Sequence, residues 1–174
     1  MRAARVFVGI IAATALLAPA ASAAPRQSHA ALSPLESGVL VDINNFRRAN
    51  NLAPLKLNLR LTQAARAHTD EMAQQGYFAH ESAGGGAFWK RIQGFYTSSP
   101  WHYWSVGENL LWSSPDVSPE HALEMWLASP EHKANLMNPR WREIGVAAVH
   151  EAAAPGVFNG LDVTIVTTDF GVRH

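Results

Sequence analysis

Apolar residues recur at helical spacing in the first ordered segment that the chain predicts: Val39, Leu40, Ile43 and Phe46. Ser33 and Glu36 stand three residues apart at its start, as in a capping box that satisfies two free backbone amides. We therefore predict a helix that begins after Ser33 and ends at Asn50-Asn51. Leu55-Lys56-Leu57 follows as a short extended link.

A second helix is predicted from about 58 to 75, closed by Gly76, with one stripe formed by Leu61, Ala65, His68 and Met72. Shorter helices are expected at 87–95, 119–128 and 130–138. A strand is expected at 106–112, and 143–149 and 161–170 read as an antiparallel pair. Because helices and strands are mixed without regular alternation, the pattern favours an α+β fold.

The N-terminus has the form of a secretory signal peptide at 1–23, with Arg2 and Arg5 ahead of a short apolar run and the small-residue site Ala21-Ser22-Ala23. Cleavage is expected after Ala23, with Ala24 as the second choice and an uncleaved anchor as the alternative. Residues 24–32 read as a flexible leader, and 33–174 as one domain. No later stretch approaches a membrane span, so we expect a secreted protein with no transmembrane span in its mature form.

Composition narrows the functional classes. The chain has no cysteine, which excludes disulfides, thiol catalysis and thiolate metal sites. Its formal net charge is zero and no basic stripe is present, so nucleic acid is not expected as a partner. We expect a monomer. The glycines at 84–86 lack the lysine and hydroxyl residue of a phosphate-binding loop, which argues against nucleotide binding.

Three histidines are candidates for chemistry. His132 lies in the first turn of the 130–138 helix, after the cap Ser129, where the helix dipole favours a neutral ring that can accept a proton or bind a metal. A plain capping-region histidine is the alternative. His68 on an apolar stripe is either a core residue or part of a polar wall. His80 lies on a loop and is either solvent-exposed or functional.

Other residues leave similar choices open. Glu108 near a strand start is either solvated, as such carboxylates usually are, or, because its neighbours are apolar, partly buried with a hydrogen-bond partner. His121 follows the same Ser-Pro-Glu-His pattern as His132 and reads as a helix start only. The run Trp101-His102-Tyr103-Trp104 is suited to stacking on sugars or to a greasy rim, and equally to a lid over the core.

Several short segments, taken together and in this order, resemble the CAP superfamily of cysteine-rich secretory, antigen 5 and pathogenesis-related proteins, in its cysteine-free bacterial SCP-like branch. The segments are 44–47, 64–73, 78–80, Gly107-Glu108-Asn109, 126–136, 143–146 and Asp169-Phe170-Gly171. They cover nearly all of the chain after residue 33. The resemblance implies a three-layer α-β-α sandwich with a central antiparallel sheet and an open cleft.

The resemblance also implies which residues meet in that cleft. His80 and His132 would be the histidine pair, and Glu108 would be the first carboxylate. These three residues are candidate catalytic residues and candidate ligands for Zn²⁺ or another divalent cation. The second carboxylate of the family would fall near Ser129 and is missing here. The further residues expected to line the cleft are His68, Asn109, Ser129 and Glu131.

Three functions remain open on this basis. A non-enzymatic extracellular binding module for a lipid, a sterol or a cell-wall ligand is favoured, because members of the family mostly resemble such modules. A metal-assisted hydrolase that uses His80, His132 and Glu108 is the alternative. The third is a structural or interaction domain with a vestigial cleft.

Overall fold

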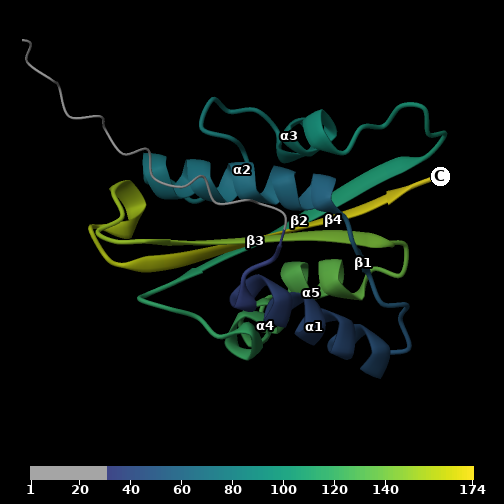
Figure 1. Cartoon of the computed structure of the whole chain (residues 1–174), viewed down its shortest axis with the longest axis horizontal. Helices are drawn as coiled ribbons and strands as arrows, with labels where there is room; N and C mark the ends of the chain where they lie inside the picture. The colour runs from purple at the N-terminus through teal and green to yellow at the C-terminus, as the bar shows by residue number, and fades with distance from the viewer. Residues whose placement is uncertain (1–30) are drawn as a thin grey trace, which may run out of the picture.

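The computed structural model describes residues 31–174, so the predicted signal segment and residues 24–30 of the predicted leader lie outside this part. Within it, a sheet forms the middle of three layers (Figure 1). One face of the sheet carries α2 (Leu59–Gln75) and α3 (Phe88–Phe95). The other face carries α1 (Pro34–Ala49), α4 (Pro119–Leu127) and α5 (Pro130–Met137). The α-β-α sandwich and the α+β class are confirmed.

The strands follow the order β1-β3-β4-β2, with bounds Lys56–Leu57, Glu143–Glu151, Val163–Arg173 and Trp104–Ser113. β4 pairs antiparallel with both β3 and β2, as predicted. The short β1 instead pairs parallel with β3, so the prediction of an antiparallel sheet is wrong at this edge. The amides of Lys56 and Asn58 donate to the carbonyls of Arg142 and Ile144, the ladder of a parallel pair.

Local signals set most helix ends. Ser33 and Glu36 form the predicted capping box of α1. Asn58 caps α2, and Gly76 closes it in the left-handed conformation at φ 69°. The hydroxyls of the serines before α4 and α5 accept from the amide three residues later. These ends agree with the sequence prediction because each depends on neighbours along the chain.

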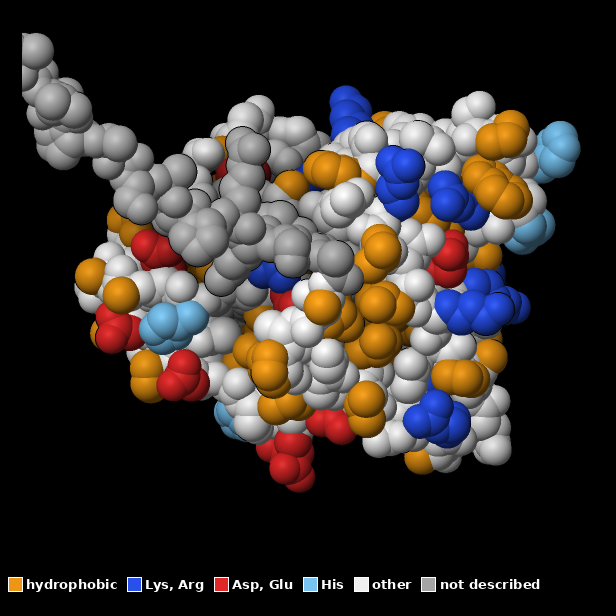
Figure 2. Space-filling model, viewed as in Figure 1, with side chains coloured by type: hydrophobic (Ala, Val, Ile, Leu, Met, Phe, Trp, Pro, Cys, Tyr) orange, Lys and Arg blue, Asp and Glu red, His pale blue; other side chains and the backbone are white. Residues whose placement is uncertain are grey.

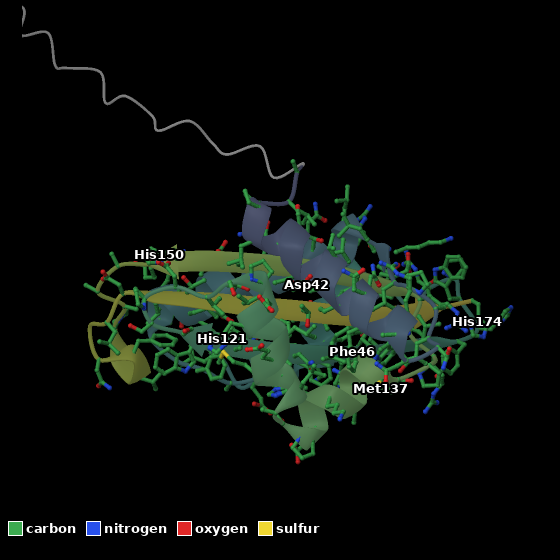
Figure 3. All side chains as sticks on the ribbon, turned by 90° about the horizontal axis from the view of Figure 1, so that it is seen from below. Asp42, Phe46, His121, Met137, His150 and His174 are labelled. Carbon is green, nitrogen blue, oxygen red and sulfur yellow. The ribbon has the colours of Figure 1, made fainter. Side chains whose placement is uncertain are left out.

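The sheet is longer than predicted at several ends. β2 begins at Trp104 rather than near residue 106, so Glu108 lies inside the strand and not at its start. β4 continues to Arg173 and is buried along almost its whole length. Figure 3 shows His150 and His174 at opposite ends of the sheet. The core lies on both faces: a large cluster under α1, α4 and α5, and two smaller ones under α2 and α3.

Among residues 31–174, no helix combines the length and the apolar character that a bilayer crossing requires.

Candidate functional site

The edge strand β2 brings together residues from both helical layers. Successive side chains of a strand point to opposite faces. Gly107 and Asn109 face α5, where Asn109 Nδ2 donates to the His132 carbonyl at 3.1 Å. Glu108 faces the α2 and α3 layer, where it contacts His80 and Arg91. A site at this edge can therefore collect one histidine from each side of the sheet.

Glu108 is the buried centre of an ion cluster. Its side chain is completely buried, and its Oε1 lies 2.8 Å from His80 Nδ1. Arg91, on α3, donates to its other oxygen, Oε2. The hydrogen bond to Glu108 is the main reason that the pKa of His80 is raised. With Nδ1 engaged in this way, Nε2 is the nitrogen of His80 that remains for a ligand.

Close packing fixes α5 against β2. A methyl group added at Gly107 would lie 2.7 Å from Asn135 Oδ1 and 2.8 Å from Trp141 Cζ2, so glycine permits the approach of these side chains. Asn135 donates to the Glu108 carbonyl and to Asn109 Oδ1. These bonds hold the helix that carries His132 in one position relative to Glu108.

A cleft of about 370 Å³ opens at this place. Its lining consists of His80, Glu108, Asn109, Glu131, His132, Ala134, Asn135 and Asn138. The structure brings together the three residues that the resemblance placed in the cleft, His80, Glu108 and His132, and adds two that were expected to line it, Asn109 and Glu131. Only one lining residue, Ala134, is apolar, so the cleft suits a polar ligand.

The two histidines of the cleft differ in proton affinity. Burial, and next the charge of His80, lowers the pKa of His132. His132 is therefore the neutral imidazole that its place in the first turn of α5 predicts, while His80 is the better proton holder. Two rings in one cleft, one with a raised and one with a lowered pKa, can together donate and accept hydrogen bonds to one ligand.

Two predicted lining residues do not line the cleft. His68 is 0% exposed and lies behind the wall, where Nε2 contacts the Ala79 carbonyl at 2.8 Å. Burial lowers its pKa, and this bond fixes the residue next to His80. Ser129 serves as the α5 cap, and its hydroxyl also donates to Glu131. A residue that caps a helix turns its side chain toward the helix amides, which explains its absence from the lining.

Asp169 is a second carboxyl group that the sequence analysis did not assign. It pairs in register with Glu108 on the neighbouring strand β4, so the two side chains share one face of the sheet. Asp169 is 0% exposed, and within residues 31–174 neither of its oxygens has a hydrogen-bond donor. Burial, and next the charge of Glu108, raises the pKa of Asp169 well above its usual value.

Asp169→Asn is expected to stabilise the protein at pH 7 by roughly 1–3 kcal/mol, because asparagine is neutral without having to take up a proton on folding. The folded state binds a proton at Asp169 that the unfolded chain releases above about pH 3.8. Wild-type stability therefore falls as pH rises from that value to the folded-state pKa. Asparagine does not titrate, so the advantage of the variant should grow over the same range. Urea unfolding at a series of pH values measures it.

Asp162→Asn is the matched control, because Asp162 is exposed and its hydrogen bond from the Ala153 amide can be kept by asparagine. It should change stability by less than about 0.5 kcal/mol at every pH. An Asp169 variant that is less stable than wild type at pH 7 would mean that Asp169 is ionised and paired there.

The cleft fits a divalent cation only in part. His80 Nε2 and the neutral ring of His132 have the chemistry of imidazole ligands, and a carboxylate behind His80 is the usual support of a metal-binding histidine. Glu108, however, is bonded through both oxygens, so ligation by it would displace His80 or Arg91. Over residues 31–174, no three His, Asp or Glu side chains are grouped as a cation site. The predicted three-ligand zinc site stays a prediction.

Four residues at the site were not singled out from the sequence: Arg91, Asn135, Asn138 and Asp169. Asn135 and Asp169 stood inside segments that resemble the CAP superfamily, but without an assigned role. Arg91 had no local signal, because its position beside Glu108 follows only from the packing of α3 on β2.

The fold agrees with the comparisons to known proteins. Residues 40–166 match the profile of CAP, the cysteine-rich secretory protein family. The chain belongs to this family. It is 30% identical over 122 residues to the uncharacterized protein YkwD of Bacillus subtilis; the match covers 70% of this chain but only 45% of that relative, so this chain spans less than half of its length.

Solved structures of other proteins share this fold. An extracellular protein with an SCP domain from Bacillus anthracis is 26% identical, with a TM-score of 0.56 over 80% of this chain and 44% of that one. An outer surface protein from Borrelia burgdorferi has a TM-score of 0.59 at 20% identity, over 78% of this chain and 90% of that one. The second likeness supports the fold alone.

Proposed function

We propose that this chain is an extracellular CAP-domain binding module that holds a polar ligand of the cell envelope between His80 and His132. The observation that carries the proposal is that one polar cleft contains two imidazoles from opposite sides of the sheet. The pKa of His80 is raised, and that of His132 is lowered. The signal-like N-terminus and the extracellular SCP-domain protein of Bacillus anthracis support the location. Seven of the eight lining residues have polar side chains, which favours a cell-wall ligand over a lipid or sterol in the cleft.

A divalent cation such as Zn²⁺ is proposed as part of this site, held by His80 Nε2 and His132, with water or the ligand completing its coordination. A bound zinc ion would supply Lewis acidity. Glu108 would orient the His80 ring by accepting a hydrogen bond from its Nδ1–H group. Arg91 would hold Glu108 in place by donating to its other oxygen.

A metal-assisted hydrolase is the second candidate. The contact between His80 and Glu108 favours it, since a carboxylate that orients an imidazole is a common arrangement for a general base. Both candidates use the same two histidines, and they differ in whether a bound substrate is turned over.

Zinc calorimetry on the mature protein is the first test. We expect a dissociation constant of about 1–10 μM, and a loss of at least about 100-fold in the double variant His80→Ala/His132→Ala, because both imidazole ligands are removed. The matched control is His121→Ala/His150→Ala, which removes two exposed histidines outside the cleft and should leave binding unchanged. Zinc affinity that survives in the cleft variant would exclude the proposed metal site.

Ligand binding is tested by co-sedimentation of the same three proteins with purified peptidoglycan. Retention of wild type and of the control, with loss of the cleft variant, is the expected result. Equal sedimentation of all three would exclude the cleft as the ligand site. Release of soluble fragments by wild type alone would favour the hydrolase.

A further inference from the structure

The aromatic run 101–104 separates into two environments. Trp104 is half-buried against α3 and its Nε1 donates to the Tyr96 carbonyl at 2.9 Å, so it covers the core. Trp101 is 45% exposed. The lid interpretation therefore holds for Trp104 and fails for Trp101, whose indole remains available to a ligand.

Arg173 is fixed beside this indole. Its guanidinium carbon lies 4.0 Å from the ring centre of the buried Tyr96 and 5.3 Å from that of Trp101. Its Nη1 donates to the Thr97 carbonyl at 3.2 Å. Among residues 31–174, no carboxylate forms an ion pair with it. A positive group held by two rings and lacking a counter-charge is prepared for an anion.

The surroundings add positive charge. Arg173 is the last residue of β4, and the Arg142 amide donates to the Gly171 carbonyl near the same end of that strand. Lys56 of β1 lies opposite Glu143, the first residue of β3, in the strand register. The three cations therefore lie at one end of the sheet. Figure 2 shows Lys and Arg side chains gathered on the half of this face where the C-terminus lies. The carboxylate of Glu143 is occupied there by Asn58 and Tyr96.

The geometry points to a second binding surface, made of Trp101, Arg173 and the loop hydroxyls of Thr97 and Ser99, that takes an acidic glycan. The indole stacks on the face of a sugar ring, and the guanidinium pairs with a sugar carboxylate. Both hydroxyl residues are exposed and lie on the same loop as the indole. This Trp101 surface is separate from the cleft, with which it shares no residue.

A glycan fits this surface better than a membrane does. Trp101 stands in the polar segment Thr97-Ser98-Ser99-Pro100-Trp101-His102, which contains no leucine, isoleucine or phenylalanine. Binding to a bilayer surface depends on a larger buried apolar area. A single indole flanked by hydroxyls and a cation instead matches one sugar unit with an acidic group.

Affinity electrophoresis in gels containing polygalacturonate tests the inference, with neutral dextran gels as the reference. Wild type should be retarded by polygalacturonate alone, and less so as salt is raised. Trp101→Ala and Arg173→Gln should each weaken the interaction about tenfold. Circular dichroism spectra of both variants check that they are folded.

Two matched variants serve as controls. Trp89→Ala removes another exposed indole with a cation near its ring, and Lys133→Gln removes an exposed charge on α5. Both should bind as wild type does. The inference would be overturned if the controls lost binding equally or if wild type were not retarded. It would also be overturned if the protein bound phosphatidylglycerol vesicles through Trp101 and did not bind polygalacturonate. Zinc binding through the cleft histidines is measured separately, so failure of one site leaves the other testable.

Discussion

Gly145→Ala should destabilise the protein by more than about 3 kcal/mol, because β3 and α2 touch at this residue. A methyl group there would lie 2.1 Å from both the Leu61 carbonyl carbon and the Thr62 amide nitrogen. These are backbone atoms of α2, so no side-chain rotation relieves the clash. The helix would have to move away from the sheet, and the packing beneath Leu61 would be lost. Urea unfolding followed by circular dichroism gives the change in free energy.

Gly94→Ala is the matched control in α3. A methyl group there would meet no atom within 4 Å. Alanine restricts the unfolded chain more than glycine does, so this variant should gain about 0.5–1 kcal/mol. If the two alanine variants unfolded at the same urea concentration, close packing of α2 on β3 would be refuted.

Arg47→Met should destabilise the protein by roughly 2–4 kcal/mol. Arg47 is completely buried and donates to three carbonyls, those of Ala53, Leu136 and Asn138. Two of these end α5, where a positive charge also complements the helix dipole. Methionine keeps much of the apolar stem but leaves the buried carbonyls without a donor. The same unfolding measurement applies, and amide hydrogen exchange should show faster opening of α5 than of α2.

Arg48→Met provides the comparison at the next position. Arg48 is exposed and its guanidinium bonds only to Asn45 among the residues described, so its loss should cost less than about 0.5 kcal/mol. Similar effects of both substitutions would mean that the carbonyls at the end of α5 do not depend on Arg47. Since α5 carries His132, a specific loss at Arg47 should also weaken zinc binding by the cleft.

The candidate site shows where prediction from sequence succeeds and where it stops. His80, Glu108 and His132 were brought together by a resemblance to a family and not by local pattern. The expected hydrogen-bond partner of Glu108 is found, but the side chain is completely rather than partly buried, and it has two partners, of which Arg91 is one. The partner could not be named from sequence, because Arg91 reaches Glu108 across the packing of a helix on a strand.

Two residues that are expected in the cleft lining, His68 and Ser129, lie outside it. The stripe that contains His68 predicts that it points inward, and it does, but it lies behind the cleft wall. Ser129 was assigned to the lining through the family pattern, yet its own capping role directs its hydroxyl to α5. A sequence position gives the face of a helix, whereas the neighbours on that face depend on the other layers.

Helix ends could be placed from the order of residues alone, because a capping serine, a left-handed glycine and a proline at the first helical position act on atoms a few residues away. The class of fold likewise follows from the period of the apolar residues. Packing of the three layers was needed to establish that β1 runs parallel to β3, that Asp169 lies opposite Glu108, and that Trp101 stays exposed beside Arg173. These features depend on strand register and on contacts between residues far apart in the chain, which no local pattern encodes.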